Sequence, residues 1–142
     1  MASVFDVAAY ILKKKKAVTA MKLQKLVYYA QAWSLVWDEK PLFKERFEAW
    51  ANGPVCPALY AAHRGEFTIT DEPRGDPKKL AKVQKETLDA VLRDYGNKSA
   101  SWLSELTHNE DPWIDARRGI PDGDRSNSPI TDAAMAEYYG AL

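Results

Sequence analysis

The chain has 142 residues and a mass of 16.0 kDa, with 46% hydrophobic side chains and 20 basic against 20 acidic residues. A chain of this length buries roughly 70% of its unfolded surface, so it needs no disulfide or metal ion for stability, and zero net charge argues against binding a polyanion. One cysteine fits a reducing compartment, and no stretch reaches the roughly 18 apolar residues of a membrane span, so we expect a cytoplasmic protein.

The N-terminal part of the chain predicts two helices. Ser3 can cap the first, in which apolar residues recur with helical spacing as far as a run of lysines at 13–16. The charge of these lysines suits the negative end of the helix macrodipole. Thr19 begins a second helix, which reaches about Trp37 and is apolar on most sides, so we expect it to be buried.

This pair of helices has a helix-turn-helix outline. A recognition helix presents polar side chains to base edges, whereas the second helix would present tyrosine, tryptophan and leucine. We therefore expect no nucleic-acid binding. A helix-turn-helix regulator remains a third hypothesis, which salt-sensitive DNA binding would support.

The middle of the chain predicts a small β element. Residues 47–50 alternate in character like a short strand, and residues 66–70 could form its partner. Between them, the glycine and prolines of residues 52–57 predict a tight turn into a helix at about 57–63.

The C-terminal half predicts further helices. Asp76 caps a long helix from Pro77 to about Tyr95, Ser99 caps a short helix, and Thr131 or Asp132 caps the last one. The sequence therefore predicts a mainly α fold, with residues 1–142 forming a single helical domain of about six helices and a small β-hairpin.

No pattern of catalytic residues stands out. Cys56 and His63 would lie about 10 Å apart along one helix, beyond hydrogen-bond reach, so we expect the thiol to be structural. His108, with the acids at 110 and 111, is the best metal-ligand cluster, but no second ligand pair has a recognised spacing. Glycine-rich phosphate loops and serine-hydrolase motifs are absent. We expect no enzyme activity, no cofactor and no metal site.

Aromatic residues are the unusual part of the composition, with five tryptophans and seven tyrosines. Most of the tryptophans could simply fill the core. Trp50 and Tyr60 flank the rigid turn at 52–57, and aromatic side chains in such places are typical of binding surfaces.

Several segments together resemble the Panacea domain, the family of SocA-type antitoxins and GepA-like phage-associated proteins. The resemblance covers about residues 5–140, and the joint order and spacing of its segments carry it. These segments are KLQKLVYYAQAW at 22–33, FEAWANGPV at 47–55, SWLSEL at 101–106, THNEDPW at 107–113 and the terminal Tyr138-Tyr139.

The resemblance implies an antitoxin that neutralises a cognate protein toxin by binding it directly, and some relatives act as adaptors that deliver a toxin to a protease. Some relatives also carry an N-terminal DNA-binding region, whereas only about 20 residues precede KLQKL here, so we do not expect operator binding. For the partner-binding face we predict Trp50, Asn52, Pro54, Tyr60, His63 and Arg64.

Two alternatives remain open. Asn52, Gly53 and Pro54 could serve only to shape the backbone, without touching a partner. The protein could also be a phage-associated module or a proteolytic adaptor that has no cognate toxin.

Overall fold

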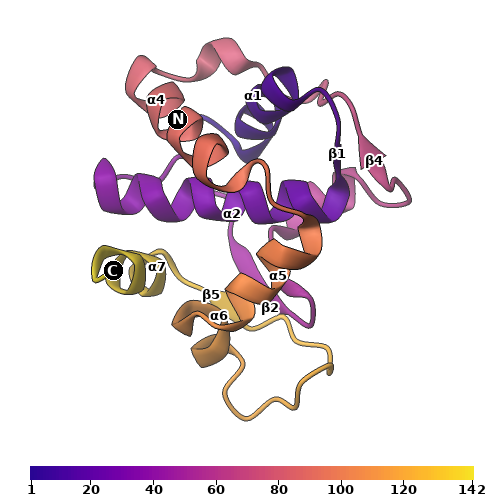
Figure 1. Cartoon of the computed structure of the whole chain (residues 1–142), viewed down its shortest axis with the longest axis vertical. Coiled ribbons are helices and arrows are strands. Elements are labelled where there is room, and N and C mark those ends of the chain that lie inside the picture. Colours follow the sequence, from indigo (N-terminus) through magenta and orange to yellow (C-terminus); the bar gives the residue numbers. More distant parts are fainter.

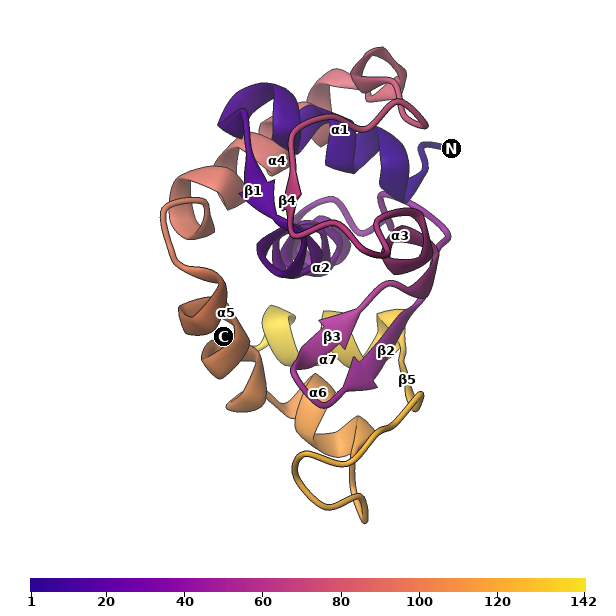
Figure 2. The ribbon, with the colours of Figure 1, turned by 90° about the vertical axis from the view of Figure 1, so that its right-hand side faces the viewer.

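The computed structural model describes every residue from Met1 to Leu142. Helix α2 (Ala20–Trp37) lies at its centre, and the views of Figures 1 and 2 show the other elements around it. On one side lie α1 (Val4–Lys15) and α4 (Lys82–Tyr95). On the other side lie β2 (Phe47–Trp50), β3 (Gly53–Val55), α5 (Ala100–His108), α6 (Asp111–Ala116) and α7 (Asp132–Gly140).

Both N-terminal helices begin where the capping residues predict. The Ser3 hydroxyl accepts the Asp6 N–H at 3.3 Å, and the Asp6 carboxylate accepts the Ser3 N–H at 2.9 Å, which completes a capping box. Thr19 caps α2 by accepting the Lys22 N–H at 3.1 Å. Of the 18 residues of α2, 11 are buried, so the prediction of a helix buried on most sides is confirmed.

The strand at 47–50 is confirmed, but its predicted partner is wrong. β2 pairs with β3 and, on its other edge, with β5 (Pro129–Ile130), all antiparallel. Trp50 faces Gly53, so only two residues separate β2 from β3. Residues 53–55, predicted as part of a tight turn, form the edge strand β3, where the missing N–H of Pro54 is tolerated. β4 (Thr68–Ile69) pairs instead with β1 (Val18–Thr19).

The single helix predicted from Pro77 to Tyr95 is also wrong in its first part. Asp76 caps a short 3₁₀ helix, η1 (Pro77–Lys79), after which Leu80 is extended (ψ 134°) and α4 begins at Lys82. Leu80 is buried, and burying a leucine stabilises by about 1.5–3 kcal/mol. This gain exceeds the roughly 0.5–1.5 kcal/mol of one helical hydrogen bond, so the chain leaves the helix to place the side chain in the core.

The remaining helices follow the prediction closely. α3 (Pro57–Ala62) has proline in its first turn, Ser99 caps α5, and Thr131 caps α7. The mainly α fold with a small antiparallel β element is confirmed, with seven α-helices in place of about six. One hydrophobic core collects side chains from Ala2 to Tyr139. None of the helices combines the length and the apolar character that crossing a bilayer requires.

Candidate functional site

Helix α2 holds the β2–β3 hairpin in place through two buried polar side chains of the KLQKL segment. The Gln24 amide accepts the Cys56 N–H at 2.8 Å and donates to the Cys56 carbonyl at 3.3 Å. Next to it, the Lys25 ammonium donates to the Pro54 carbonyl at 3.2 Å. Two of the segments that carry the family resemblance, KLQKL and NGPV, are therefore in direct contact.

A third polar residue of α2, Gln31, holds the backbone of the segment that precedes β2. Gln31, seven residues or two helical turns after Gln24, accepts the Leu42 N–H at 2.8 Å and donates to the Phe43 carbonyl at 2.9 Å. The polar residues of this otherwise apolar helix thus satisfy backbone groups that would be left unpaired in the core.

Lys25 is buried, with 1% of its surface exposed, and it forms no ion pair with a carboxylate. Burial lowers the pKa of its ammonium group to about 8. Gly53 lies directly against it: a Cβ atom at Gly53 would stand 2.6 Å from Lys25 Cε and 3.0 Å from Thr107 Oγ1. The tip of the hairpin, α2 and α5 therefore meet with no room for a side chain at position 53.

The structure brings together the two aromatic residues that the sequence analysis singled out. The Trp50 and Tyr60 rings contact edge to face, with centroids 4.8 Å apart. The Trp50 indole N–H donates to Glu48 Oε1 at 2.9 Å, and Arg46 binds the other oxygen of Glu48 at 2.8 Å. We call this row of contacting side chains, Arg46–Glu48–Trp50–Tyr60, the hairpin face.

The other predicted contact residues differ in accessibility. Asn52 is exposed at the hairpin tip, where its carbonyl accepts the Ser104 hydroxyl at 2.5 Å, and Arg64 is exposed just beyond α3. Pro54 is buried. His63 is also buried and is hydrogen-bonded to Glu72 at 2.6 Å. A partner that docks without rearrangement would reach Trp50, Asn52, Tyr60 and Arg64, and the part of all six residues in binding stays a prediction.

Cys56 and His63 do not form a reactive pair. The Cys56 side chain is completely buried, and burial raises the pKa of its thiol to about 11. His63 is occupied by Glu72, whose other oxygen binds Arg74 at 3.1 Å. Because the thiol pKa is raised and His63 is not free to act as a base, very little Cys56 thiolate is present at neutral pH.

This burial gives a prediction for Cys56. Cys56→Ser places a hydroxyl in the core, so we expect the free energy of unfolding to fall by about 1–2 kcal/mol while partner binding stays unchanged. Iodoacetamide should label the native thiol at least roughly a hundredfold more slowly than it labels the chain in urea. Rapid native labelling, or lost binding by a folded serine variant, would contradict a structural role.

The cluster around His108 is not arranged as a metal site. Glu110 accepts hydroxyl groups from the core, whereas the His108 ring stacks on Trp113 with centroids 4.1 Å apart. No group of three or more histidine, cysteine, aspartate and glutamate residues is placed to hold a metal ion.

Glu110 is instead the centre of a buried network that the sequence analysis missed. Its Oε1 atom accepts the Tyr29 hydroxyl at 2.6 Å and the Tyr139 hydroxyl at 2.7 Å, and the Tyr139 and Tyr28 hydroxyl groups are hydrogen-bonded to each other at 3.1 Å. Burial raises the pKa of the Glu110 carboxyl, and the two hydroxyl donors partly oppose that rise. The network joins α2 to α7 and to the residue before α6.

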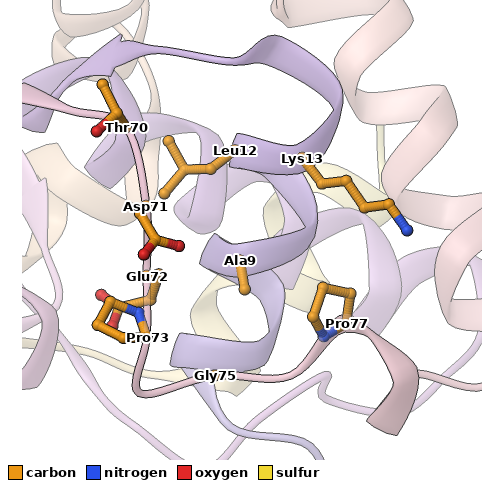
Figure 3. A pocket seen from close by; sticks show the side chains of 9 residues that line it. All are labelled: Ala9, Leu12, Lys13, Thr70, Asp71, Glu72, Pro73, Gly75 and Pro77. Atoms are coloured by element: carbon orange, nitrogen blue, oxygen red, sulfur yellow. The ribbon is translucent and has the colours of Figure 1, made fainter.

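Two of the seven surface cavities adjoin the elements described above. The smaller, about 280 Å³, lies between α1 and the segment 70–77. Figure 3 shows that Lys13 extends away from Asp71 there, and Glu72 is already bonded to His63 and Arg74.

The larger cavity, about 600 Å³, lies beside the hairpin tip and is lined by α5, α6 and the loop that follows. The Trp113 indole N–H fixes one wall of this cavity by donating to the Trp50 carbonyl at 2.8 Å.

Residues of this site fall in a range that is similar to known proteins. Residues 23–114 match the family described as "Antitoxin SocA-like, Panacea domain", and this range contains the hairpin and most of α2. The antitoxin SocA of Caulobacter vibrioides (strain NA1000 / CB15N) is 31% identical over 125 residues, covering 75% of this chain and 66% of that protein. The chain thus spans slightly less than two thirds of this relative's length. No solved structure matches the chain significantly.

Proposed function

Because the chain belongs to the SocA-like antitoxin family with a Panacea domain, we propose that it is an antitoxin that inhibits a protein toxin by binding it directly. In this proposal the chain acts in the cytoplasm, catalyses no reaction, needs no cofactor and binds no nucleic acid. The observation that carries the proposal is the family match over the residues that build the hairpin and its support on α2.

The hairpin face has the composition and rigidity that protein binding favours. Tryptophan, tyrosine and arginine dominate the energetics of protein interfaces, and all three occur in the row Arg46–Glu48–Trp50–Tyr60. The bonds from Gln24 and Lys25 to the hairpin hold this surface before any partner arrives. Little conformational entropy would then be lost on binding, so more of the contact energy appears as affinity.

The test is a binding measurement with the toxin encoded beside this gene. We expect the double variant Trp50→Ala/Tyr60→Ala to bind that toxin at least about tenfold more weakly and to lose rescue of growth on co-expression. The matched control is Trp37→Ala. Trp37 is 46% exposed, close to the 42% of Tyr60, but it lies about 18 Å along α2 from Lys25.

The outcomes separate three ideas. Undiminished binding by the folded double variant would remove the hairpin face from the interface. An equal loss in the Trp37 variant would mean that any exposed aromatic residue matters. If no toxic gene lies beside this one, and the chain instead captures a protease or a phage protein, the chain is the adaptor or phage-associated module that the sequence analysis left open.

A further inference from the structure

The side chain of Arg117 at the larger cavity is a buried cation without a carboxylate partner. Only 4% of the residue surface is exposed, and the guanidinium donates to the carbonyl groups of Ala49 at 3.0 Å, Pro121 at 3.1 Å and Asp124 at 2.7 Å. Its Nε–H group is buried and has no acceptor. Neutral carbonyl groups stabilise the guanidinium only in part, because the buried charge remains uncompensated.

A second unpaired polar atom lines the same cavity. Nε2 of His108 is buried without a hydrogen-bond partner, and both the His108 ring and the Arg117 guanidinium pack on the indole of Trp113. Lys25, the other buried cation without an acid, lies close enough to His108 to lower the pKa of the imidazole, after the larger effect of burial. Arg118, which also lines the cavity, is paired with Asp115.

The acid that lines the cavity is Asp122, on the exposed loop after α6, and it forms no ion pair. Glu105 also acts on His108, so cations and acids balance on this side of the hairpin; Arg117 is set apart because no carboxylate forms an ion pair with it. Ile114, which is 42% exposed, and Ile120 give the cavity an apolar part beside its cationic part. The lining thus matches a ligand that carries a negative charge next to an apolar group.

The donors in the cavity are side chains, and this indicates which anionic group fits best. Arginine pairs with side-chain carboxylates in planar, charge-assisted hydrogen bonds, whereas the C-terminal carboxylate of a chain is typically captured by successive backbone N–H groups. The cavity offers a guanidinium and an imidazole at the tip of a hairpin already proposed to face a protein.

We propose that this cavity binds an aspartate or glutamate side chain of a partner polypeptide, with the carboxylate beside Arg117 and an adjacent apolar residue against Trp113 and Ile114. That this partner is the toxin rests on the proposed function, whereas the affinity of the cavity for an acidic peptide does not. The cavity adjoins the hairpin face through the Trp113 to Trp50 hydrogen bond, so one partner can reach both surfaces.

The test uses the full chain and a short capped peptide, acetyl-Leu-Asp-Leu-amide, titrated while the Trp113 indole and Arg117 Nε–H signals are followed by NMR. We expect saturable shifts of both signals, and none with acetyl-Leu-Asn-Leu-amide, which lacks the charge. Asp122→Asn removes the competing acid and should tighten the peptide about two- to fivefold. Glu86→Gln, the same charge change on the exposed face of α4, should leave the affinity unchanged.

A variant that fills the cavity avoids the loss of the three carbonyl contacts that replacing Arg117 would cause. Ala51 lines the cavity from the hairpin, and Ala51→Leu should abolish the shifts while the chain stays folded.

Equal affinities for the aspartate and asparagine peptides would overturn the proposal, as would equal effects of Asp122→Asn and Glu86→Gln. Binding of acetyl-Leu-Leu with a free C-terminus, in place of the aspartate peptide, would overturn the assignment to an acidic side chain. None of these results depends on whether a toxin binds the hairpin face.

Discussion

Glu110→Ala is expected to lower the free energy of unfolding by about 2–5 kcal/mol. The substitution removes the shared acceptor of the Tyr29 and Tyr139 hydroxyls, and a buried donor left without a partner costs about 1–3 kcal/mol. Only Tyr139 keeps another contact, to the Tyr28 hydroxyl. Urea denaturation followed by tryptophan fluorescence measures the loss, which is a large fraction of the 5–15 kcal/mol typical of such proteins.

Glu110→Gln is the control, because the amide oxygen can still accept both hydroxyls. The second carboxylate oxygen makes no hydrogen bond within the protein, so the amide nitrogen can take its place. We expect Glu110→Gln to change the stability by less than about 1.5 kcal/mol. Equal destabilisation by both substitutions would mean that the charge itself, and not the acceptor, holds the three tyrosines.

The raised pKa of Glu110 also fixes the sign of a pH effect. The folded state holds the proton above the ordinary glutamate value of 4.5, whereas the unfolded state releases it there. The stabilising contribution of this group is therefore complete below pH 4.5 and is lost as the pH rises through the folded-state pKa. The stability of the natural chain relative to Glu110→Gln should fall as the pH rises above about 4.5, and a rise would show that ionisation favours the fold.

Asp6 acts in the opposite direction. Burial is the largest single effect on the Asp6 carboxyl and raises its pKa, but the backbone hydrogen bonds from Asp76 and Ser3 and the charge of Lys79 together lower the pKa below 3.8. Its contribution is present above pH 3.8 and is lost as the pH falls through the folded-state value. Measuring the difference between the natural chain and Glu110→Gln, rather than the natural chain alone, cancels this effect of Asp6.

Local chemistry was enough to predict where most helices begin. Ser3, Thr19, Ser99 and Thr131 all cap helices by accepting the backbone N–H three residues later, an interaction contained in a few consecutive residues. Strand pairing depends on residues far apart in the chain. The partner of β2 on one edge is β5, about 80 residues away, and no local pattern indicates that contact.

The candidate site was partly predictable for the same reason. The rigid turn at 52–57 led to Trp50 and Tyr60, and the structure places their rings in contact. Glu110 was missed because its tyrosine partners come from α2 and α7, 81 and 29 residues away. One available signal was overlooked: Gln24 and Gln31 lie on a helix expected to be buried, and buried amides require partners.

Tryptophan exposure was the least predictable feature of the surface. The sequence allowed that most of the tryptophans fill the core, yet Trp37 and Trp102 are 46% and 44% exposed. Trp37 stacks on Trp33, and Lys98 packs over Trp102. One face of each exposed indole is therefore covered by a neighbouring side chain, although neither ring enters the core. Periodicity shows which side of a helix turns inward but does not show how far the core extends along it.

Gly53→Ala is expected to lower the free energy of unfolding by about 2–4 kcal/mol and to weaken binding through the hairpin face. The backbone of Gly53 has φ +123°, a conformation that costs other residues about 1–3 kcal/mol. The new Cβ would also stand 2.6 Å from Lys25 Cε, so Lys25 must move and would strain its bond to Pro54. Gly65→Ala is the matched control, since φ is +86° there and nothing lies within 4 Å.

A double-mutant cycle separates the contact from the backbone strain. In a Lys25→Ala background the side chain that blocks position 53 is gone, so Gly53→Ala should cost at least about 1 kcal/mol less than it does in the natural chain. The cost that remains should still exceed that of Gly65→Ala, because the new Cβ stands 3.0 Å from Thr107 Oγ1 and the conformation at positive φ is still penalised. If Gly53→Ala costs the same in both backgrounds, the packing of KLQKL against NGPV does not restrict position 53. The rigidity of the hairpin face would then come from Gln24 and its two bonds to Cys56.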